Sequence, residues 1–338
     1  MKENRLLDLW SARAESGDPI GCVSTTYTFD GSFFEDECLS RFAGMETDRN
    51  EDARSYLIER EQKLSEIFAA VLVDRRNVTT KRSLRWHQLP VTVPRGVLHA
   101  KLTLLAWRNC IRVLVGSANL TRAGYRSNYE QMAAFDFTPD GTTPASLLFE
   151  TIDFLGKVAK FASGPAGRLG DFLSTVESQA QSWIDPGWQP RETRAVLMPV
   201  VPGQPSLFQQ IAKEWRGTGP SEAAVTSPFF DEGERANAVV EELIEALAVN
   251  GERTITFETS GRHLPAERVV ELDLPAAYAS ARARRVQHKF AYATAQDAEK
   301  NVRALHAKSI RLQRGDQRMF IFGSSNFTGA GTGIDSKW

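Results

Sequence analysis

One polar pattern occurs twice in this chain at a fixed spacing of 207 residues, and this repeat constrains the fold more than any other feature. The repeated residues are His99, Lys101 and Asn119 in the first copy and His306, Lys308 and Asn326 in the second. The spacings are 306 − 99 = 207, 308 − 101 = 207 and 326 − 119 = 207. Because three residue types keep their register over so long an interval, we expect two copies of one unit that build one site from two halves.

Both copies have the same local setting, a pair of apolar segments closed by a turn of small residues. In the first copy, residues 98–105 and 113–115 lead to the turn 116–119; in the second, residues 305–322 lead to the turn 323–326. Side chains two positions apart on a strand point to the same face, so each histidine and its lysine are expected side by side. The glycine and serines of each turn allow a ligand to approach the backbone closely.

The residues upstream of each copy also correspond. A segment rich in β-branched and aromatic residues at 22–29 ends at Asp30, and a similar one at 223–230 ends at Asp231, where 231 − 30 = 201. Residues with helical apolar spacing follow each segment. We therefore predict an α/β fold of two similar lobes, each a mixed β-sheet flanked by helices. Pseudo-two-fold symmetry is expected to relate the lobes, with the site between them.

The predicted boundaries follow from the breaks in the chain. Residues 1–165 form the N-terminal lobe, residues 166–195 are a connecting segment, and residues 196–338 form the C-terminal lobe. The second lobe is expected to be truncated at its C-terminal end, because the sequence stops 338 − 326 = 12 residues after Asn326. The first lobe continues after its turn into a predicted strand at 132–137.

Composition and charge exclude several classes of protein. The formal charge of −1 over 338 residues means that polyanion binding would have to come from local patches. Three scattered cysteines argue against a disulfide framework. No apolar run approaches the roughly 20 residues of a membrane span, and the N-terminus lacks the pattern of a signal peptide. We expect a cytoplasmic protein that does not contact membranes, with no metal and no cofactor, since no cluster of ligands has metal-binding spacing.

The residue types of the repeat suit the cleavage of a phosphodiester. An imidazole can act as a nucleophile or as a general acid near neutral pH. Lys101 and Lys308 would neutralise the charge that builds on the phosphate oxygens in the transition state. Two copies together thus supply a nucleophile, an acid and two cations, and this chemistry needs no metal.

The doubled His-x-Lys and Gly-Ser-x-Asn elements resemble those of the phospholipase D superfamily, over roughly residues 20–140 and 220–330. In the fuller family pattern an aspartate follows the lysine after four residues, but Ala106 and Gln313 stand at those positions. Without this aspartate, the motif is more similar to that of the nuclease and tyrosyl-DNA phosphodiesterase-like branch. The resemblance implies a covalent phosphohistidine intermediate, with His99 as nucleophile and His306 as general acid, although the residues themselves leave the order open.

The resemblance also draws attention to Glu130 and to the serines of the two turns. Glu130 lies 130 − 119 = 11 residues after Asn119, where family members often carry a carboxylate that orients a catalytic imidazole. The same offset in the second copy falls on Lys337. Ser117 and Ser324 are candidate phosphate contacts, and the alternative is that they only form the turns.

A basic stretch precedes each copy of the repeat. The candidate substrate-binding residues are Lys81, Arg82 and Arg85 in the first stretch and Arg282, Arg284 and Arg285 in the second. Trp86 and Phe290 are available there for stacking on nucleobases. The alternative is that both stretches are solvated faces.

The favoured function is that of a metal-independent nuclease or DNA-end phosphodiesterase, of a kind that in bacteria serves phage defence or DNA repair. DNA is favoured over RNA as the partner, and a helicase-like or other protein partner is also considered. Two alternatives stay open: a phospholipid-cleaving enzyme of phospholipase D type, and a non-catalytic nucleic-acid-binding subunit of a larger complex. The sequence does not predict the oligomeric state.

Overall fold

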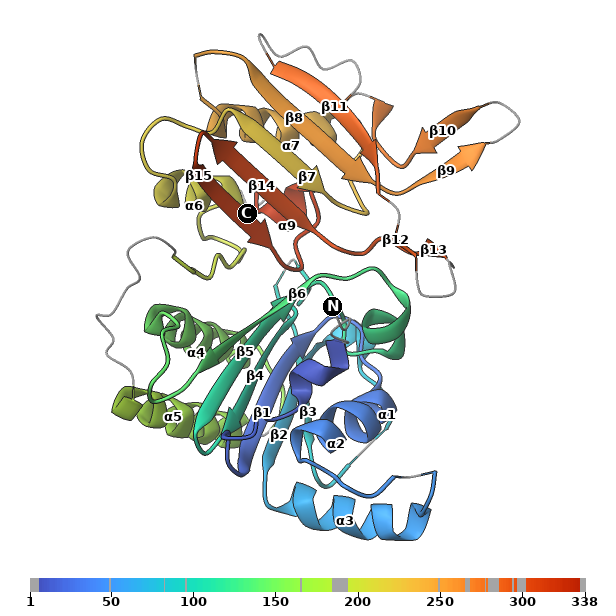
Figure 1. Cartoon of the computed structure of the whole chain (residues 1–338), viewed down its shortest axis with the longest axis vertical. Helices are drawn as coiled ribbons and strands as arrows, with labels where there is room; N and C mark the ends of the chain where they lie inside the picture. The colour runs from blue at the N-terminus through green and yellow to red at the C-terminus, as the bar shows by residue number, and fades with distance from the viewer. Residues whose placement is uncertain are drawn as a thin grey trace. The chain divides into compact units, whose positions relative to one another are not determined.

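The computed structural model describes residues 6–48, 50–81, 83–94, 96–164, 166–183, 194–248, 250–264, 268–276, 278, 286–293, 295–296 and 302–334. The chain divides into two compact units, each built around one large sheet (Figure 1). The first unit contains Met1–Val115, Asn119–Arg126 and Met132–Leu197. The second unit contains Met198–Trp338 together with two short pieces of the first half of the sequence, Gly116–Ala118 and Ser127–Gln131.

The first unit has a six-stranded sheet in the order β3-β2-β1-β4-β5-β6. Its strands are β1 (Pro19–Thr26), β2 (Phe68–Asp74), β3 (His87–Val91), β4 (Leu102–Trp107), β5 (Cys110–Gly116) and β6 (Met132–Phe137). β1, β2 and β3 pair in parallel, whereas β4 pairs antiparallel with both β1 and β5. Nearly every residue of β2, β4 and β5 is buried, because helices cover both faces of the sheet.

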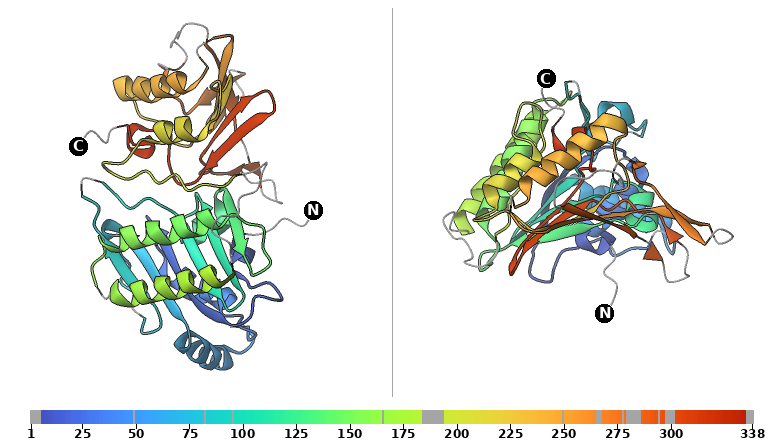
Figure 2. Two further views of the ribbon diagram at one scale, coloured as in Figure 1. Left: turned by 90° about the vertical axis from the view of Figure 1, so that its left-hand side faces the viewer. Right: turned by 90° about the horizontal axis from the view of Figure 1, so that it is seen from above.

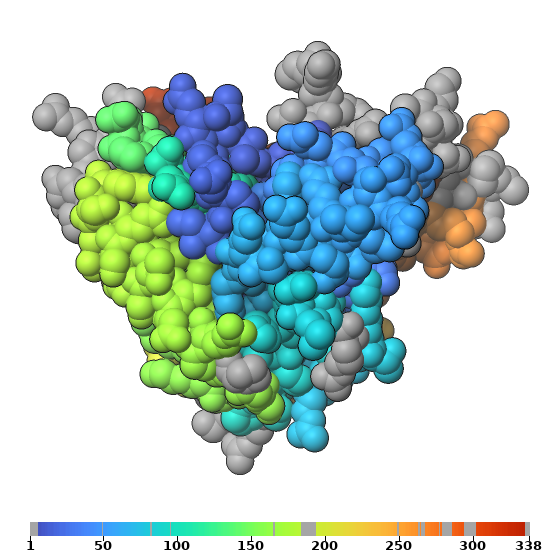
Figure 3. Space-filling model, turned by 90° about the horizontal axis from the view of Figure 1, so that it is seen from below, coloured from blue at the N-terminus to red at the C-terminus, as the bar shows by residue number. Residues whose placement is uncertain are grey.

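Two long helices cover one face of this sheet, and shorter segments lie on the other (Figure 2). The helical segments are η1 (Leu6–Trp10), α1 (Gly31–Phe33), η2 (Phe34–Leu39), α2 (Ser40–Phe42), α3 (Ala53–Ser65), η3 (Arg75–Asn77), η4 (Ala123–Ser127), α4 (Ala145–Ala159) and α5 (Ala166–Trp183). Leu148 of α4 and Leu169 of α5 pack with Leu104 and Val113 of the sheet in one apolar core. In the view from below, α3 (blue) and α5 (yellow-green) cover different parts of the surface (Figure 3).

The predicted connecting segment 166–195 differs from what the structure shows. Residues 166–183 form α5, and its buried side chains Leu169, Phe172 and Val176 belong to the first core. A regular apolar spacing is hidden there among glycine and serine residues, which favoured the prediction of a linker. Residues 184–193 lie outside the described part of the chain.

The second unit has a five-stranded sheet in the order β11-β8-β7-β14-β15. Its strands are β7 (Glu222–Thr226), β8 (Arg253–Thr259), β11 (Val286–Tyr292), β14 (Ser309–Arg314) and β15 (Gln317–Phe322). The remaining elements are α6 (Leu207–Glu214), α7 (Gly233–Ala246), α9 (Gly329–Thr332) and the short strands β9 (Gly261–Leu264), β10 (Val269–Leu272), β12 (Ala295–Gln296) and β13 (Val302–Arg303). Val225 and Ile310 of the sheet pack with Leu243 of α7 and Ile211 of α6.

The two sheets share one plan, as the repeat predicts. β7 pairs in parallel with β8 and antiparallel with β14, which pairs with β15. The same relations connect β1 with β2, β4 and β5. The predicted α/β class, with two mixed sheets flanked by helices, is therefore confirmed. Among the described residues, none of the helices combines the length and the apolar character that crossing a lipid bilayer requires.

Candidate active site

The second half-site lies where the chain enters β14. His306 and Lys308 are on the extended segment directly before that strand. The ammonium group of Lys308 is folded back and donates a hydrogen bond to the backbone carbonyl of His306. Lys308 is only 2% exposed, so its charge lies beside the histidine in a poorly solvated place. The ring centroid of Phe229 is 6.5 Å from that of His306.

Glu130 binds the imidazole of His306. Its Oε1 lies 2.7 Å from Nδ1 of His306, and its side chain has 0% exposed surface. The backbone holds the two segments together, because the carbonyl of Tyr129 accepts hydrogen bonds from the N–H groups of His306 and Ala307, both at 2.9 Å. Glu130 belongs to the second unit for this reason, although it lies in the first half of the sequence.

Two further side chains keep Glu130 in place and ionised. Ser117 donates from Oγ to Oε2 of Glu130 at 2.5 Å, and Asn128 donates from Nδ2 to Oε1 at 3.1 Å. Burial raises the pKa of Glu130, but the hydrogen bonds from His306, Ser117 and Asn128 outweigh it and leave the pKa below its usual value. An ionised Glu130 makes Nδ1 of His306 the protonated nitrogen, so chemistry at this ring falls to Nε2.

Burial also affects Lys308. Removal from water lowers the pKa of its ammonium group to about 8, and the negative charge of Glu130 opposes part of that shift. The second half-site therefore places the ammonium group of Lys308 and the carboxylate of Glu130 beside the imidazole of His306.

The first half-site repeats the local arrangement of histidine and lysine. Nζ of Lys101 donates to the backbone carbonyl of His99 at 2.9 Å, as Lys308 does to His306. The ring centroid of Tyr27 lies 5.3 Å from that of His99. Asp74, at the end of β2, accepts a hydrogen bond from the N–H of Leu98 at 2.8 Å and so fixes the residue before His99.

The two asparagines of the repeat differ in their partners. Oδ1 of Asn119 accepts hydrogen bonds from the N–H groups of Tyr27 and Thr28, both at 3.3 Å. Pro228 stands in the place of Tyr27, since 228 − 27 = 201, and proline has no N–H. Phe229 stands in the place of Thr28, and its N–H donates to Oγ of Ser227 at 3.4 Å instead. In the described part of the chain, the buried Oδ1 of Asn326 has no hydrogen-bond partner.

The turn serines do not share one role. Ser117 was predicted to contact substrate, but its buried hydroxyl is used by Glu130 and by the N–H of Gln131 at 2.9 Å. It is a partner of Glu130 rather than a surface for a ligand. Ser324 lies half-buried after β15, and its contact with a phosphate stays a prediction.

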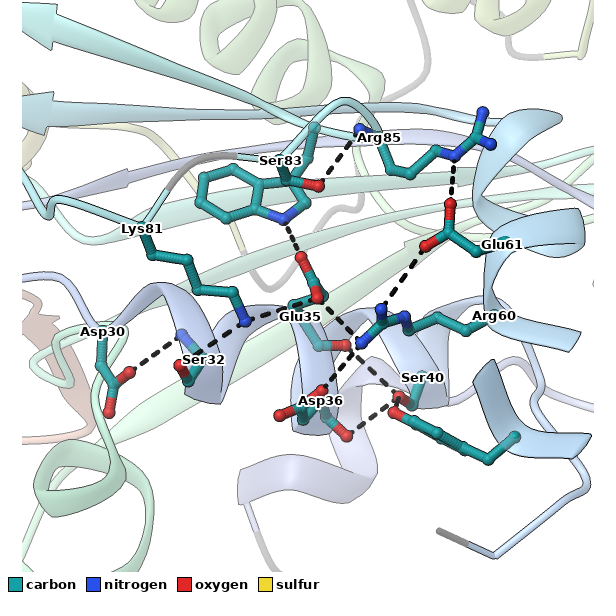
Figure 4. A network of polar contacts seen from close by, with 12 residues as sticks. Asp30, Ser32, Glu35, Asp36, Ser40, Arg60, Glu61, Lys81, Ser83 and Arg85 are labelled. Atoms are coloured by element: carbon teal, nitrogen blue, oxygen red, sulfur yellow. Dashed lines mark hydrogen bonds and ion pairs between the residues drawn. The ribbon is translucent and has the colours of Figure 1, made fainter. Parts of the chain in front are cut away.

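The first basic stretch is paired with carboxylates of the first unit, and its contact with substrate stays a prediction (Figure 4). Nζ of Lys81 lies 3.4 Å from Oε1 of Glu35, and Nε of Arg85 lies 2.8 Å from Oε2 of Glu61. Trp86 is buried and donates from Nε1 to Glu35 at 2.7 Å, so it cannot stack on a base. Lys81 and Arg85 thus have ion-pair partners within the first unit. The other four candidates, Arg82, Arg282, Arg284 and Arg285, lie outside the described residues.

Sequence reasoning did not assign a role to Asp74, which accepts a hydrogen bond from the residue before His99, or to Asn128, which donates one to Glu130. An aspartate at the end of an apolar strand was the available signal for Asp74. Within the described ranges, no three His, Cys, Asp or Glu side chains come together as a metal site.

Comparison with solved structures shows which proteins share the fold of this chain. No protein-family model matches the chain, and no curated protein matches its sequence. The solved structure of a variant of yeast tyrosyl-DNA phosphodiesterase matches with a TM-score of 0.51 at 8% identity, over 96% of this chain and 80% of that one. Another structure of the yeast enzyme matches with a TM-score of 0.50 at 9% identity, over the same shares. Polyphosphate kinase from Porphyromonas gingivalis matches at 0.43 and 11% identity, over 94% of this chain, which spans 42% of that kinase.

The chain has the fold of the phospholipase D superfamily. The resemblance expected from the doubled motif is thereby confirmed at the level of the fold.

Proposed function

We propose that this protein is a phosphodiesterase of phospholipase D type that cleaves nucleic acid without a metal ion, through a phosphohistidine. The observation that carries the proposal is the hydrogen bond of the buried Glu130 to Nδ1 of His306, beside the buried Lys308. A carboxylate that fixes the tautomer of an imidazole is the arrangement that general acid–base catalysis requires.

In the first step, a ring nitrogen of His99 attacks phosphorus, and the bond from phosphorus to the leaving oxygen breaks. Nε2 of His306 gives its proton to that oxygen, while Glu130 stabilises the imidazolium before the transfer. Lys101 and Lys308 balance the charge on the non-bridging oxygens. In the second step, water attacks phosphorus, His306 takes its proton, and the phosphorus–nitrogen bond breaks to free His99.

Nucleic acid is the proposed substrate class, with DNA tested first. The support is the likeness in fold to a protein that is named for its action on DNA. Lysine side chains beside each imidazole suit any phosphodiester, so the substrate must be identified by assay.

The test is cleavage of a labelled panel of DNA and RNA oligonucleotides in EDTA. We expect cleavage by the unaltered protein and none by the His99→Ala or His306→Ala variants. The matched control is His87→Ala, because His87 lies on β3 and contacts Arg168 rather than either half-site. Cleavage that needs a divalent ion, or that survives His99→Ala, contradicts the proposal. Cleavage of phospholipid vesicles but of no oligonucleotide assigns the protein to the alternative class.

A further inference from the structure

A cluster of three arginines surrounds one carboxylate in the first unit. Glu37 of η2 is contacted by Arg41 at 3.3 Å, by Arg122 at 3.4 Å and by Arg126 at 2.7 Å. These contacts bring three positive charges to one negative charge. Arg122 follows Asn119 by three residues, so the cluster adjoins the turn of the first half-site.

Arg41 alone is sufficient to pair with Glu37. It stands four residues further along the same helical stretch and also donates to the backbone carbonyl of Glu37 at 2.8 Å. The side chains of Arg122 and Arg126 are 63% and 45% exposed, whereas that of Glu37 is 17% exposed. A guanidinium has five N–H donors, so the contact of Arg122 with one carboxylate oxygen leaves donors for an anion from solvent.

The turn that carries these arginines occurs in both units. Gly124 packs so closely on Asn119 that an added Cβ would collide with the backbone oxygen of that asparagine. Gly331 has the same relation to Asn326, and 331 − 124 = 207. The repeat therefore builds this turn twice by the same means.

The arginines are not needed to build the turn. The residues that correspond to Arg122 and Arg126 in the second copy are Gly329 and Gly333, since 329 − 122 = 207 and 333 − 126 = 207. Glycine at both positions forms the turn that leads into and closes α9. The two positive charges are thus an addition confined to the first copy, and they call for a role other than folding.

We propose that Arg122 and Arg126 bind a backbone phosphate of the nucleic-acid strand, next to the phosphodiester that is cleaved. This inference rests on the proposed function and names a second contact with the same substrate. Arginine pairs with phosphate through two parallel N–H···O bonds. A polymer with a phosphate in every nucleotide supplies such a second anion beside the scissile one, whereas a phospholipid with a single phosphodiester does not.

The test measures the affinity for a fluorescent single-stranded oligonucleotide by anisotropy, with His99→Ala as background so that the strand stays intact. We expect Arg122→Ala and Arg126→Ala each to weaken binding about three- to tenfold at low salt. Each should also reduce the slope of log affinity against log salt by about 0.7. Glu37→Gln should strengthen binding, because it removes the negative charge of the cluster. The control is Arg108→Ala, an exposed arginine of the same unit that pairs with Asp18 at 3.3 Å.

Equal affinities and equal salt slopes for Arg122→Ala, Arg126→Ala and Arg108→Ala would overturn the inference. So would a result in which the two substitutions reduce sedimentation with phosphatidylglycerol vesicles but not strand binding. Binding is measured without turnover, so the failure of this inference differs from the failure of the proposed function. The latter shows as absent cleavage by the unaltered protein, whatever the arginines do.

Discussion

The hydrogen bond between Glu130 and His306 determines which nitrogen of the imidazole is available for chemistry. With Oε1 of the carboxylate 2.7 Å from Nδ1, the ring presents Nε2 to a substrate. Ser117 and Asn128 hold the carboxylate from two other directions. This set of contacts gives His306 the properties of a general acid and base.

Glu130→Gln should lower kcat about 100-fold or more, because an amide neither fixes the tautomer nor stabilises the imidazolium. The affinity for substrate should change little, since the side chain of Glu130 has no exposed surface. Steady-state kinetics on a labelled oligonucleotide measures both parameters. Glu271→Gln is the control, because Glu271 is an exposed carboxylate of the same unit that pairs with Arg262. Equal kcat values for the two variants would show that Glu130 has no part in catalysis.

Lys308 gives a prediction on stability and pH. Its pKa is about 8 when folded, below the value of about 10.4 for a lysine in an unfolded chain. The unfolded state therefore binds more protons between these values, and the contribution of Lys308 to the free energy of unfolding rises as pH increases from 8 to 10.4. Lys308→Met removes this dependence. Relative to Lys308→Met, the unaltered protein should therefore gain on the order of 3 kcal/mol in its free energy of unfolding across that window.

Urea denaturation at several pH values between 7 and 10.5 measures this difference. Other titrating groups are common to both proteins and cancel in the comparison. A difference that stays constant with pH would mean that the lysine is not desolvated as the structure indicates.

At the scale of elements, a run of basic residues in the sequence does not show which of their charges are available to bind a ligand. Lys81 and Arg85 fall in a basic stretch, yet each pairs with a glutamate from a distant element. Glu35 is the centre of this network, with contacts from Trp86, Lys81 and Arg60 (Figure 4). The network joins η2, α3 and the segment before β3.

Glu35→Gln should lower the free energy of unfolding by about 3 kcal/mol, because Glu35 is buried and its cationic partners Arg60 and Lys81 are partly shielded from water. Glu61→Gln, which affects the exposed contacts of Glu61 with Arg85 and Arg60, should cost less than about 1 kcal/mol. Urea denaturation at pH 7 compares the two variants. A similar small effect for both would show that the network does not stabilise the first unit.

Helix α5 gives a second prediction at this scale, since it belongs to the first unit and not to a linker. Leu169→Ala should destabilise the protein by about 2–5 kcal/mol, because it leaves a cavity in the buried core. Leu57→Ala on α3 is the control, because Leu57 is exposed and should change stability by less than about 0.5 kcal/mol. If thermal or urea unfolding gives the same stability for both variants, α5 does not contribute to the core of the first unit.

For the whole molecule, the repeat predicts most of the fold. Residues 207 apart occupy matching positions in two sheets of the same plan, because a register kept over that distance reflects a repeated unit. The repeat could not show that Glu130 binds His306, since this pairing depends on the backbone contact between Tyr129 and Leu305. It also could not show that Ser117 faces inward, or that Oδ1 of Asn326 lacks the donors that Asn119 has. Such differences depend on partners far away in the chain.

The central claim is that His99 forms a covalent bond to phosphorus and that His306 serves proton transfer. The measurement is intact-peptide mass spectrometry of the His306→Ala variant after mixing with a nucleotide p-nitrophenyl phosphodiester, quenched in alkaline denaturant. p-Nitrophenolate leaves without a proton, so the first step should proceed while the second is slow. We predict a nucleotidyl adduct on the peptide that contains His99. The double variant His99→Ala/His306→Ala should form none. An adduct on a different residue, or turnover by His306→Ala at the rate of the unaltered protein, would contradict the account.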